Sequence, residues 1–297
     1  MSDYTQQLQA MEPTKEYLVA IDSDGCVFDA MGIKQRECFC PMMIAYFGLQ
    51  PVAEAARECK EFADLFSKTR GANRHITIAR ILTELLPSHP MVKERAFQVP
   101  QFSHYVQWVN DPDSLLSDAG LKQAIDKAAG PAKAQLQTAL TWSIRVNEMV
   151  AEVVKHIPPF PYARESFEKI TEYADILVCS STPVEALLRE WTGHDVAKYT
   201  HLIAGQEMGS KAEHLAVMTQ KYDPDNILMM GDALGDQKAA ETNNTLFYPI
   251  NPGHEAASWK RFHEEAFDKF LNGQYAGSYQ DQRKEEFAAC LPEHPSW

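Results

Sequence analysis

The sequence predicts an α/β fold: a doubly wound parallel sheet whose chain is interrupted after the first strand by a helical module. An apolar strand pattern at residues 17–21 stands alone, because residues 29–156 carry helical rather than strand signals. From residue 157 onward, short apolar strands alternate with helices, which is typical of a parallel sheet covered on both faces. The first strand therefore needs partners from beyond the helical stretch, and we expect that stretch to be an insertion.

These patterns divide the chain into three parts. We expect an α/β core from residues 1–29 and 157–250, a helical insertion at residues 30–156, and a C-terminal helical extension at residues 251–297. An insertion of roughly 125 residues is long enough to fold as a domain. The proline-rich segment 157–161 would lead the chain back into the core. The extension carries no motif, and we expect it to pack on the core or at a subunit interface.

The elements follow from apolar periodicity and from the positions of proline and glycine. The expected strands lie at residues 17–21, 175–180, 201–204, 226–230 and 245–248. The helices expected between them lie at residues 162–173, 183–191, 211–222 and 234–242. The clearest helices of the insertion and of the extension lie at residues 76–86, 115–129, 132–154, 255–270 and 281–289.

Composition and charge exclude several classes of protein. The chain has 28 Lys and Arg against 41 Asp and Glu, a net charge of −13, whereas nucleic acids and anionic membranes favour basic surfaces. The first 17 residues carry no apolar signal core, and no stretch approaches the roughly 18 apolar residues of a membrane span. Among six cysteines only Cys38 and Cys40 are closely spaced, and without a second such pair the cysteines fit reduced thiols better than a metal site. We expect a cytoplasmic protein without nucleic-acid or membrane partners, and a homodimer stays open.

Polar side chains follow the expected strands at their carboxyl ends, which is where parallel sheets bind ligands. Two acids come directly after the first strand, and because they are two residues apart they project to the same side of an extended chain. Two serines follow the second strand, a lysine begins the helix after the third, and two more acids follow the fourth. These residues are Asp22, Asp24, Ser180, Ser181, Lys211, Asp232 and Asp236.

The order and spacing of these residues resemble the four motifs of the haloacid dehalogenase-like (HAD) hydrolase superfamily. The first motif, Asp-x-Asp-Gly-x-x-x-Asp, corresponds to residues 22–29, and the second, a strand ending in Ser or Thr, to residues 178–183. The third is Lys211, and the fourth lies at residues 231–236. The resemblance implies a Rossmann-like core. The helical insertion is similar to the cap domain of the phosphoglycolate phosphatase and β-phosphoglucomutase-like branch.

The resemblance implies a role for each acid. Asp22 would be the nucleophile that forms an aspartyl-phosphate, and Asp24 would protonate the leaving oxygen and then deprotonate the attacking water. The implied cofactor is Mg²⁺, a hard cation that prefers oxygen ligands. Its ligands would be the Asp22 side chain, the Asp24 backbone carbonyl and Asp232. Asp236 would be a further ligand, or would orient water or the lysine.

The resemblance also implies a phosphate cradle. Ser180 and Lys211 would hold the phosphoryl oxygens, and the backbone amides of Gly25 and Ser181 would add to this cradle. Cys26 stands where many relatives carry threonine, so a side-chain hydroxyl is missing beside the expected site.

One segment of the insertion is a candidate for substrate recognition. Residues 69–74 place a glycine between two guanidinium groups, so Arg70, Asn73 and Arg74 are candidates to meet an anionic or polyhydroxyl substrate. Surface arginines without a ligand are the alternative interpretation.

The second acid narrows the reaction that the resemblance implies. Relatives that displace halide lack an acid at the position of Asp24, and phosphonate-cleaving relatives replace it. We therefore expect a Mg²⁺-dependent phosphatase that acts on a small phosphorylated metabolite, such as a sugar phosphate. A phosphomutase or phosphotransferase with the same nucleophile, and a non-catalytic binding protein on this fold, are the alternatives.

Overall fold

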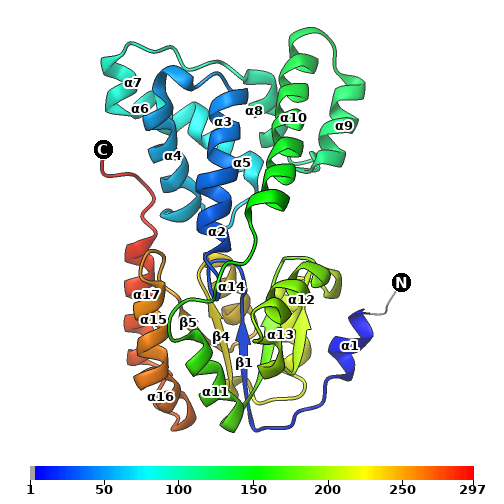
Figure 1. Ribbon diagram of the computed structural model, residues 1–297, viewed down its shortest axis with the longest axis vertical. Coiled ribbons are helices and arrows are strands. Elements are labelled where there is room, and N and C mark those ends of the chain that lie inside the picture. Colours follow the sequence, from blue (N-terminus) through cyan, green and yellow to red (C-terminus); the bar gives the residue numbers. More distant parts are fainter. Residues whose placement is uncertain (1–3) are drawn as a thin grey trace. The chain divides into compact units, whose positions relative to one another are not determined.

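The computed structural model describes residues 4–297, which divide into two compact units (Figure 1). Unit 1 comprises residues 4–31 and His156–Leu291, and unit 2 comprises Gly32–Lys155 and Pro292–Trp297. The expected C-terminal extension is therefore divided at residue 291. Its last six residues belong to unit 2, where Trp297 packs edge-on against Phe62 with the ring centroids 5.6 Å apart. The Lys68 amide also donates a hydrogen bond to the Pro292 carbonyl.

A five-stranded sheet forms the centre of unit 1, in the order β3-β2-β1-β4-β5 with every pair parallel. This confirms the predicted parallel sheet, and it places the isolated first strand in the middle, between strands that follow the helical stretch. The strands are β1 (Tyr17–Ile21), β2 (Ala174–Cys179), β3 (Leu202–Ala204), β4 (Ile227–Gly231) and β5 (Leu246–Pro249).

Helices cover both faces of this sheet, as an apolar strand buried on both sides requires. On one face, alternate residues of β1 such as Leu18 and Ala20 share a hydrophobic cluster with Leu215 and Met218. On the other face, Phe167 stacks on Trp191 at 5.5 Å between ring centroids. The helices that follow the strands are α11 (Ala163–Tyr173), α12 (Val184–Gly193), α13 (Lys211–Met218) and α14 (Leu234–Thr242).

The two ends of unit 1 also pack on the sheet. An N-terminal helix that the sequence analysis did not predict, α1 (Tyr4–Ala10), buries Leu8 in the cluster beside Met218. The predicted helix at 255–270 is confirmed, since the chain is helical without a break from Glu255 to Leu271 and a π-helical turn at Phe262–Ala266 lies between α15 and α16. The C-terminal helices are α15 (Glu255–Arg261), α16 (Phe267–Leu271) and α17 (Ser278–Cys290).

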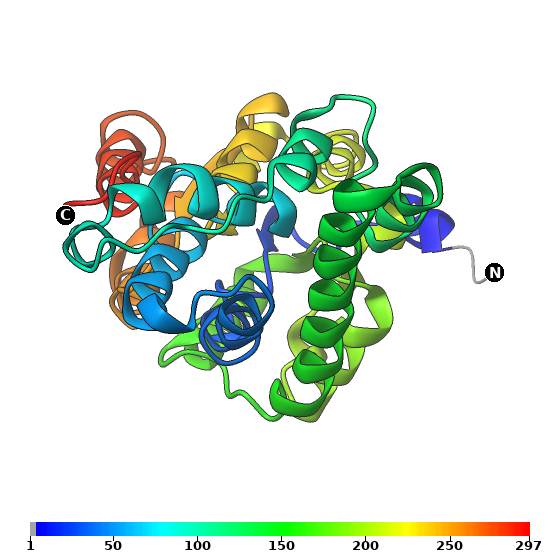
Figure 2. The same ribbon diagram turned by 90° about the horizontal axis from the view of Figure 1, so that it is seen from above.

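Unit 2 is helical, as the periodicity of the insertion predicts. Its core surrounds the fully buried Trp142, whose ring meets Phe39, Phe47 and His75 edge-on. Trp142 lies on α10 (Gly130–Val153), the longest helix among the described residues (green in Figure 2). The shorter helices of this unit include α3 (Cys40–Tyr46), α4 (Ala53–Leu65), α5 (Arg74–Arg80), α8 (Ser103–Asn110) and α9 (Asp118–Lys127). Within residues 4–297, no helix has the length and apolar character needed to cross a membrane.

Candidate active site

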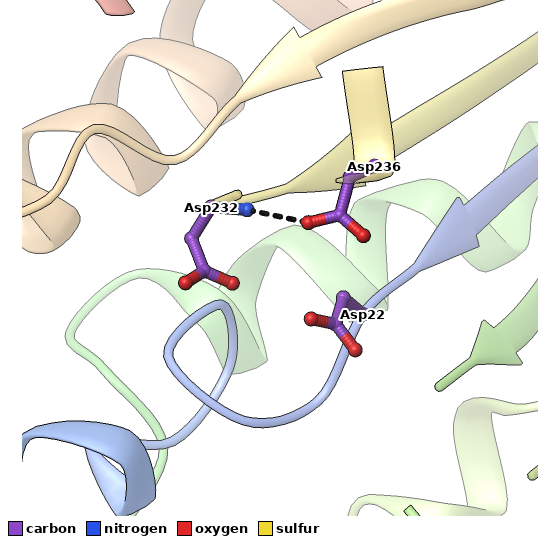
Figure 3. A group of neighbouring side chains, drawn as sticks. All are labelled: Asp22, Asp232 and Asp236. Carbon is purple, nitrogen blue, oxygen red and sulfur yellow. Dashed lines mark hydrogen bonds between the residues drawn. The ribbon is translucent and has the colours of Figure 1, made fainter. Parts of the chain in front are cut away.

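Three buried carboxylates meet at the carboxyl edge of the sheet (Figure 3). Asp22 directly follows β1, Asp232 follows β4, and Asp236 lies in the first turn of α14. One oxygen from each of the three lies within 4.8 Å of the others. Asp22 is 6% exposed, and Asp232 and Asp236 are fully buried. The parallel pairing of β1 with β4 brings these residues together across more than 200 positions of sequence.

Lys211 joins two of these carboxylates. Its Nζ atom lies 2.9 Å from Asp22 Oδ2 and 2.5 Å from Asp236 Oδ1. The lysine is the first residue of α13 because Ser210 and Glu213 form a capping box at the start of that helix. The local sequence therefore determines where α13 begins, and the start of this helix places the Lys211 ammonium group next to the carboxylates.

Asp236 also shapes the loop after β4. Its Oδ2 atom accepts a hydrogen bond from the backbone amide of Asp232 at 3.1 Å (Figure 3). The same oxygen accepts a second hydrogen bond from the Ala233 amide at 3.0 Å. The Asp236 carboxylate can lie this close to the loop only because residue 231 is glycine. A Cβ atom at that position would lie 2.3 Å from the Asp236 Cγ. Asp236 thus uses one oxygen to hold the loop and the other to hold Lys211.

Burial has the largest effect on the pKa values of this group. Burial, together with the charges of Asp236 and Asp232, raises the pKa of Asp22 to about 8, although Lys211 acts in the opposite direction. Burial alone would lower the pKa of Lys211, but the carboxylates of Asp22 and Asp236 raise it well above its usual range. The lysine therefore stays protonated, and one positive charge faces three acids.

This donor set fits a divalent cation. Three carboxylates with oxygens within reach of a common point are the ligands that hard cations such as Mg²⁺ prefer. A cation would also balance the excess negative charge that a single lysine leaves. Asp22, Asp232 and Asp236 are the residues that would hold it.

Asp24 lies in the loop after β1 and contacts the loop after β2. The hydroxyl of Thr182 donates a hydrogen bond to Asp24 Oδ2 at 3.2 Å. Sequence analysis did not single out Thr182, since its partner lies 158 positions away in the chain.

The Gly25 amide has a different role from the one that the resemblance implies. It donates to the Phe28 carbonyl at 2.8 Å, so this N–H closes a turn rather than adding to a phosphate cradle. A φ of +81° explains the glycine, because side chains disfavour that conformation. The indole of Trp259 donates to the Cys26 carbonyl at 2.8 Å, so helix α15 of the extension supports the same loop.

The two serines occupy different environments. Ser180 is buried at the end of β2, and its hydroxyl accepts a hydrogen bond from the Thr182 amide at 3.3 Å. Ser181 is exposed. Burial raises the pKa of the nearby thiols of Cys26 and Cys179, so both stay protonated and unreactive.

The candidate recognition residues of unit 2 all have structural partners within that unit. Arg70 donates to the Leu65 carbonyl at 2.9 Å, and Asn73 caps helix α5 through the His75 amide. Arg74 donates to Asn147 Oδ1 at 2.8 Å. These contacts give all three residues structural partners, and Arg70 is buried rather than on the surface. Their part in substrate recognition stays a prediction.

Fold and site together define a doubly wound α/β protein that carries a lysine-bridged carboxylate cluster at its strand ends. No family model matches the sequence, and no curated protein matches it. Solved structures of HAD-type hydrolases do resemble the chain.

A haloacid dehalogenase-like hydrolase from Streptococcus pneumoniae is 11% identical, with 82% of this chain and 90% of that chain covered and a TM-score of 0.41. A HAD-superfamily hydrolase of subfamily IA from Geobacter sulfurreducens is 14% identical, with 78% and 85% covered and a TM-score of 0.39. The protein CbbY from Rhodobacter sphaeroides, solved in complex with phosphate, is 17% identical, with 81% and 87% covered and a TM-score of 0.40.

Proposed function

We propose that this protein is a HAD-type, Mg²⁺-dependent phosphatase that hydrolyses a small phosphomonoester. The observation that carries the proposal is the position of Lys211, whose ammonium group bridges Asp22 and Asp236 inside a cluster of three buried carboxylates. A structural ion pair needs one acid for one lysine. Three clustered acids, one ammonium group and a fourth acid, Asp24, in the same loop as Asp22 suit the transfer of an anionic group.

Charge explains why a metal belongs in this proposal. A phosphate monoester is itself an anion, so its approach to three carboxylates would be opposed by Coulomb repulsion. When bound, Mg²⁺ would supply positive charge that offsets this repulsion and the charge developing on the transferring phosphoryl group. Lys211 supplies the positive charge that the chain itself provides.

Each step of the reaction would then be carried out by a residue of this chain. An Asp22 oxygen attacks phosphorus, the bond from phosphorus to the ester oxygen breaks, and Asp24 gives its proton to the departing alkoxide. Water next attacks the aspartyl-phosphate, Asp24 takes a proton from that water, and inorganic phosphate leaves while Asp22 is restored. Lys211 would hold phosphoryl oxygens throughout, and Ser180 lies at the neighbouring strand end to assist.

Asp24 also indicates the kind of leaving group. An alkoxide is a poor leaving group, so an ester of an alcohol or sugar gains most from an acid that protonates the departing oxygen. We therefore propose phosphorylated small metabolites with hydroxyl leaving groups as the substrate class.

A panel of phosphorylated metabolites tests this proposal, with release of inorganic phosphate measured in Mg²⁺ and after chelation. We expect at least one ester to be hydrolysed with Mg²⁺ and not in excess chelator. Asp22→Asn should lower kcat by at least about a thousandfold, since it removes the nucleophile. Asp225→Asn is the matched control, because this exposed acid precedes β4 at the opposite edge of the sheet.

Full activity in Asp22→Asn would contradict the proposed nucleophile. Formation of an isomeric phosphate ester without release of inorganic phosphate would show a phosphomutase instead of a hydrolase.

A further inference from the structure

We propose that Thr182 is a positioning residue that orients Asp24 for proton transfer. This inference rests on the proposed phosphatase function and adds a residue to it. The hydroxyl of Thr182 donates to Asp24 Oδ2 at 3.2 Å, which links the loop after β2 to the loop after β1. The contact lies within unit 1, next to the strand ends that carry Asp22 and Ser180.

This hydrogen bond gives the two oxygens of Asp24 different surroundings, because only Oδ2 contacts the Thr182 hydroxyl. A carboxylic acid carries its proton on one oxygen and accepts hydrogen bonds on the other. When Asp24 carries a proton and the Thr182 hydroxyl donates to Oδ2, that proton is on Oδ1. The same bond restricts rotation of the carboxyl group, so the proton is held in one direction rather than averaged over several.

The backbone of Thr182 is itself held from two sides. Its amide donates to the Ser180 hydroxyl at 3.3 Å, and its carbonyl accepts from the Gln206 amide at 3.1 Å. Gly205 lies so close that a Cβ atom there would be 2.6 Å from the Thr182 carbonyl oxygen. Only a residue without a side chain lets the loop after β3 approach this carbonyl. The hydroxyl of Thr182 is therefore presented to Asp24 from a fixed backbone.

A positioning role makes a prediction that a purely structural role does not. Thr182 would act only through the proton that Asp24 delivers, and the need for that proton depends on the leaving group. A poor leaving group depends strongly on a well-placed acid, whereas a leaving group that departs as a stable anion hardly needs one. Loss of the hydroxyl should therefore change the dependence of rate on leaving group.

The test compares phenyl, 4-nitrophenyl and 2,4-dinitrophenyl phosphate, whose leaving groups become better in that order. The measured quantity is kcat/KM with Mg²⁺, which reports the steps up to phosphorylation of the enzyme. For Thr182→Val we expect kcat/KM to fall roughly tenfold to hundredfold with phenyl phosphate, in line with the loss of one hydrogen bond to an ionisable group. With 2,4-dinitrophenyl phosphate the fall should be less than about threefold.

Two further variants test whether the effect is specific to the hydroxyl of Thr182. Thr182→Ser keeps the hydroxyl and should restore the wild-type dependence on the leaving group. Thr171→Val is the matched control, because Thr171 lies near the end of α11, just before β2 and at the far edge of the sheet. Thermal unfolding of each variant checks that the fold is kept, and Thr182→Ala replaces Thr182→Val if the larger side chain does not fold.

Equal losses across the three esters, or no loss at all, would overturn the role of Thr182. A wild-type protein that hydrolyses none of these esters or of the metabolite panel would instead overturn the proposed phosphatase function. The two failures are therefore distinguishable by the wild-type measurement alone.

Discussion

Replacing Asp22 by asparagine should stabilise the metal-free protein at neutral and alkaline pH. Burial, with the charges of Asp236 and Asp232, raises the pKa of Asp22 to about 8, whereas an unfolded chain has an ordinary aspartate near pKa 3.8. Between these two values the folded protein keeps a proton that the unfolded chain has released. The folded state thus binds more protons, and its stability falls as the pH rises through this range.

The size of the effect follows from the two pKa values. Each unit of difference corresponds to about 1.4 kcal/mol, so a difference of about four units sets a ceiling near 6 kcal/mol at pH 8. Asparagine has nearly the same shape and does not titrate, so Asp22→Asn avoids this loss. Lys211 keeps its contact with Asp236 in the variant.

Urea unfolding in excess chelator, repeated from pH 5 to pH 8.5, measures the difference directly. We expect Asp22→Asn to exceed the wild type by several kcal/mol at pH 8 and the gap to close toward pH 5. Saturating Mg²⁺ should stabilise the wild type more than the variant, which has lost a ligand. A variant less stable than the wild type at pH 8 in chelator would refute the electrostatic account of the site.

Four other variants probe the same cluster and the buried His214. Lys211→Met leaves three acids without a cation, so we expect a loss of roughly 3 kcal/mol in urea unfolding at pH 8 and a smaller loss at pH 5. Gly231→Ala would place a Cβ 2.3 Å from the Asp236 Cγ and should cost about 1–3 kcal/mol, whereas Gly235→Ala, with open space around it, should be neutral or stabilising. Burial lowers the pKa of His214 to about 4, below that of an unfolded histidine, so stability should fall as the pH drops from about 6.5 to 4. His214→Gln should reduce that fall in an acid titration of stability.

Much of unit 1 could be predicted from local sequence. The apolar run that ends in Asp22 predicts a buried strand, and its isolation predicts partners beyond the helical stretch, which the pairing of β1 with β2 and β4 confirms. Ser210 and Glu213 cap the helix that begins at Lys211, which is also a local signal. These features depend on residues close in sequence, where periodicity and capping rules apply.

The remaining features depend on contacts that no local pattern encodes. Thr182 meets Asp24 only because β1 and β2 are adjacent, and Trp259 reaches the Cys26 carbonyl from 233 positions away. The resemblance implies that the Gly25 amide faces a ligand, but the turn that requires its positive φ also gives that amide a carbonyl partner. Trp297 belongs to unit 2 through its contact with Phe62, and a polar C-terminal segment gives no sign of such a contact.

The central claim is that Asp22 becomes phosphorylated during turnover. Asp24→Asn should slow hydrolysis of the intermediate, so rapid acid quenching of this variant with substrate and Mg²⁺, followed by peptide mass spectrometry, tests the claim most directly. The account predicts a phosphoryl group on the peptide that contains Asp22, and none when Asp22→Asn is added. Phosphate release by a double variant that lacks both acids, or a phosphoryl group on a different residue, would contradict it.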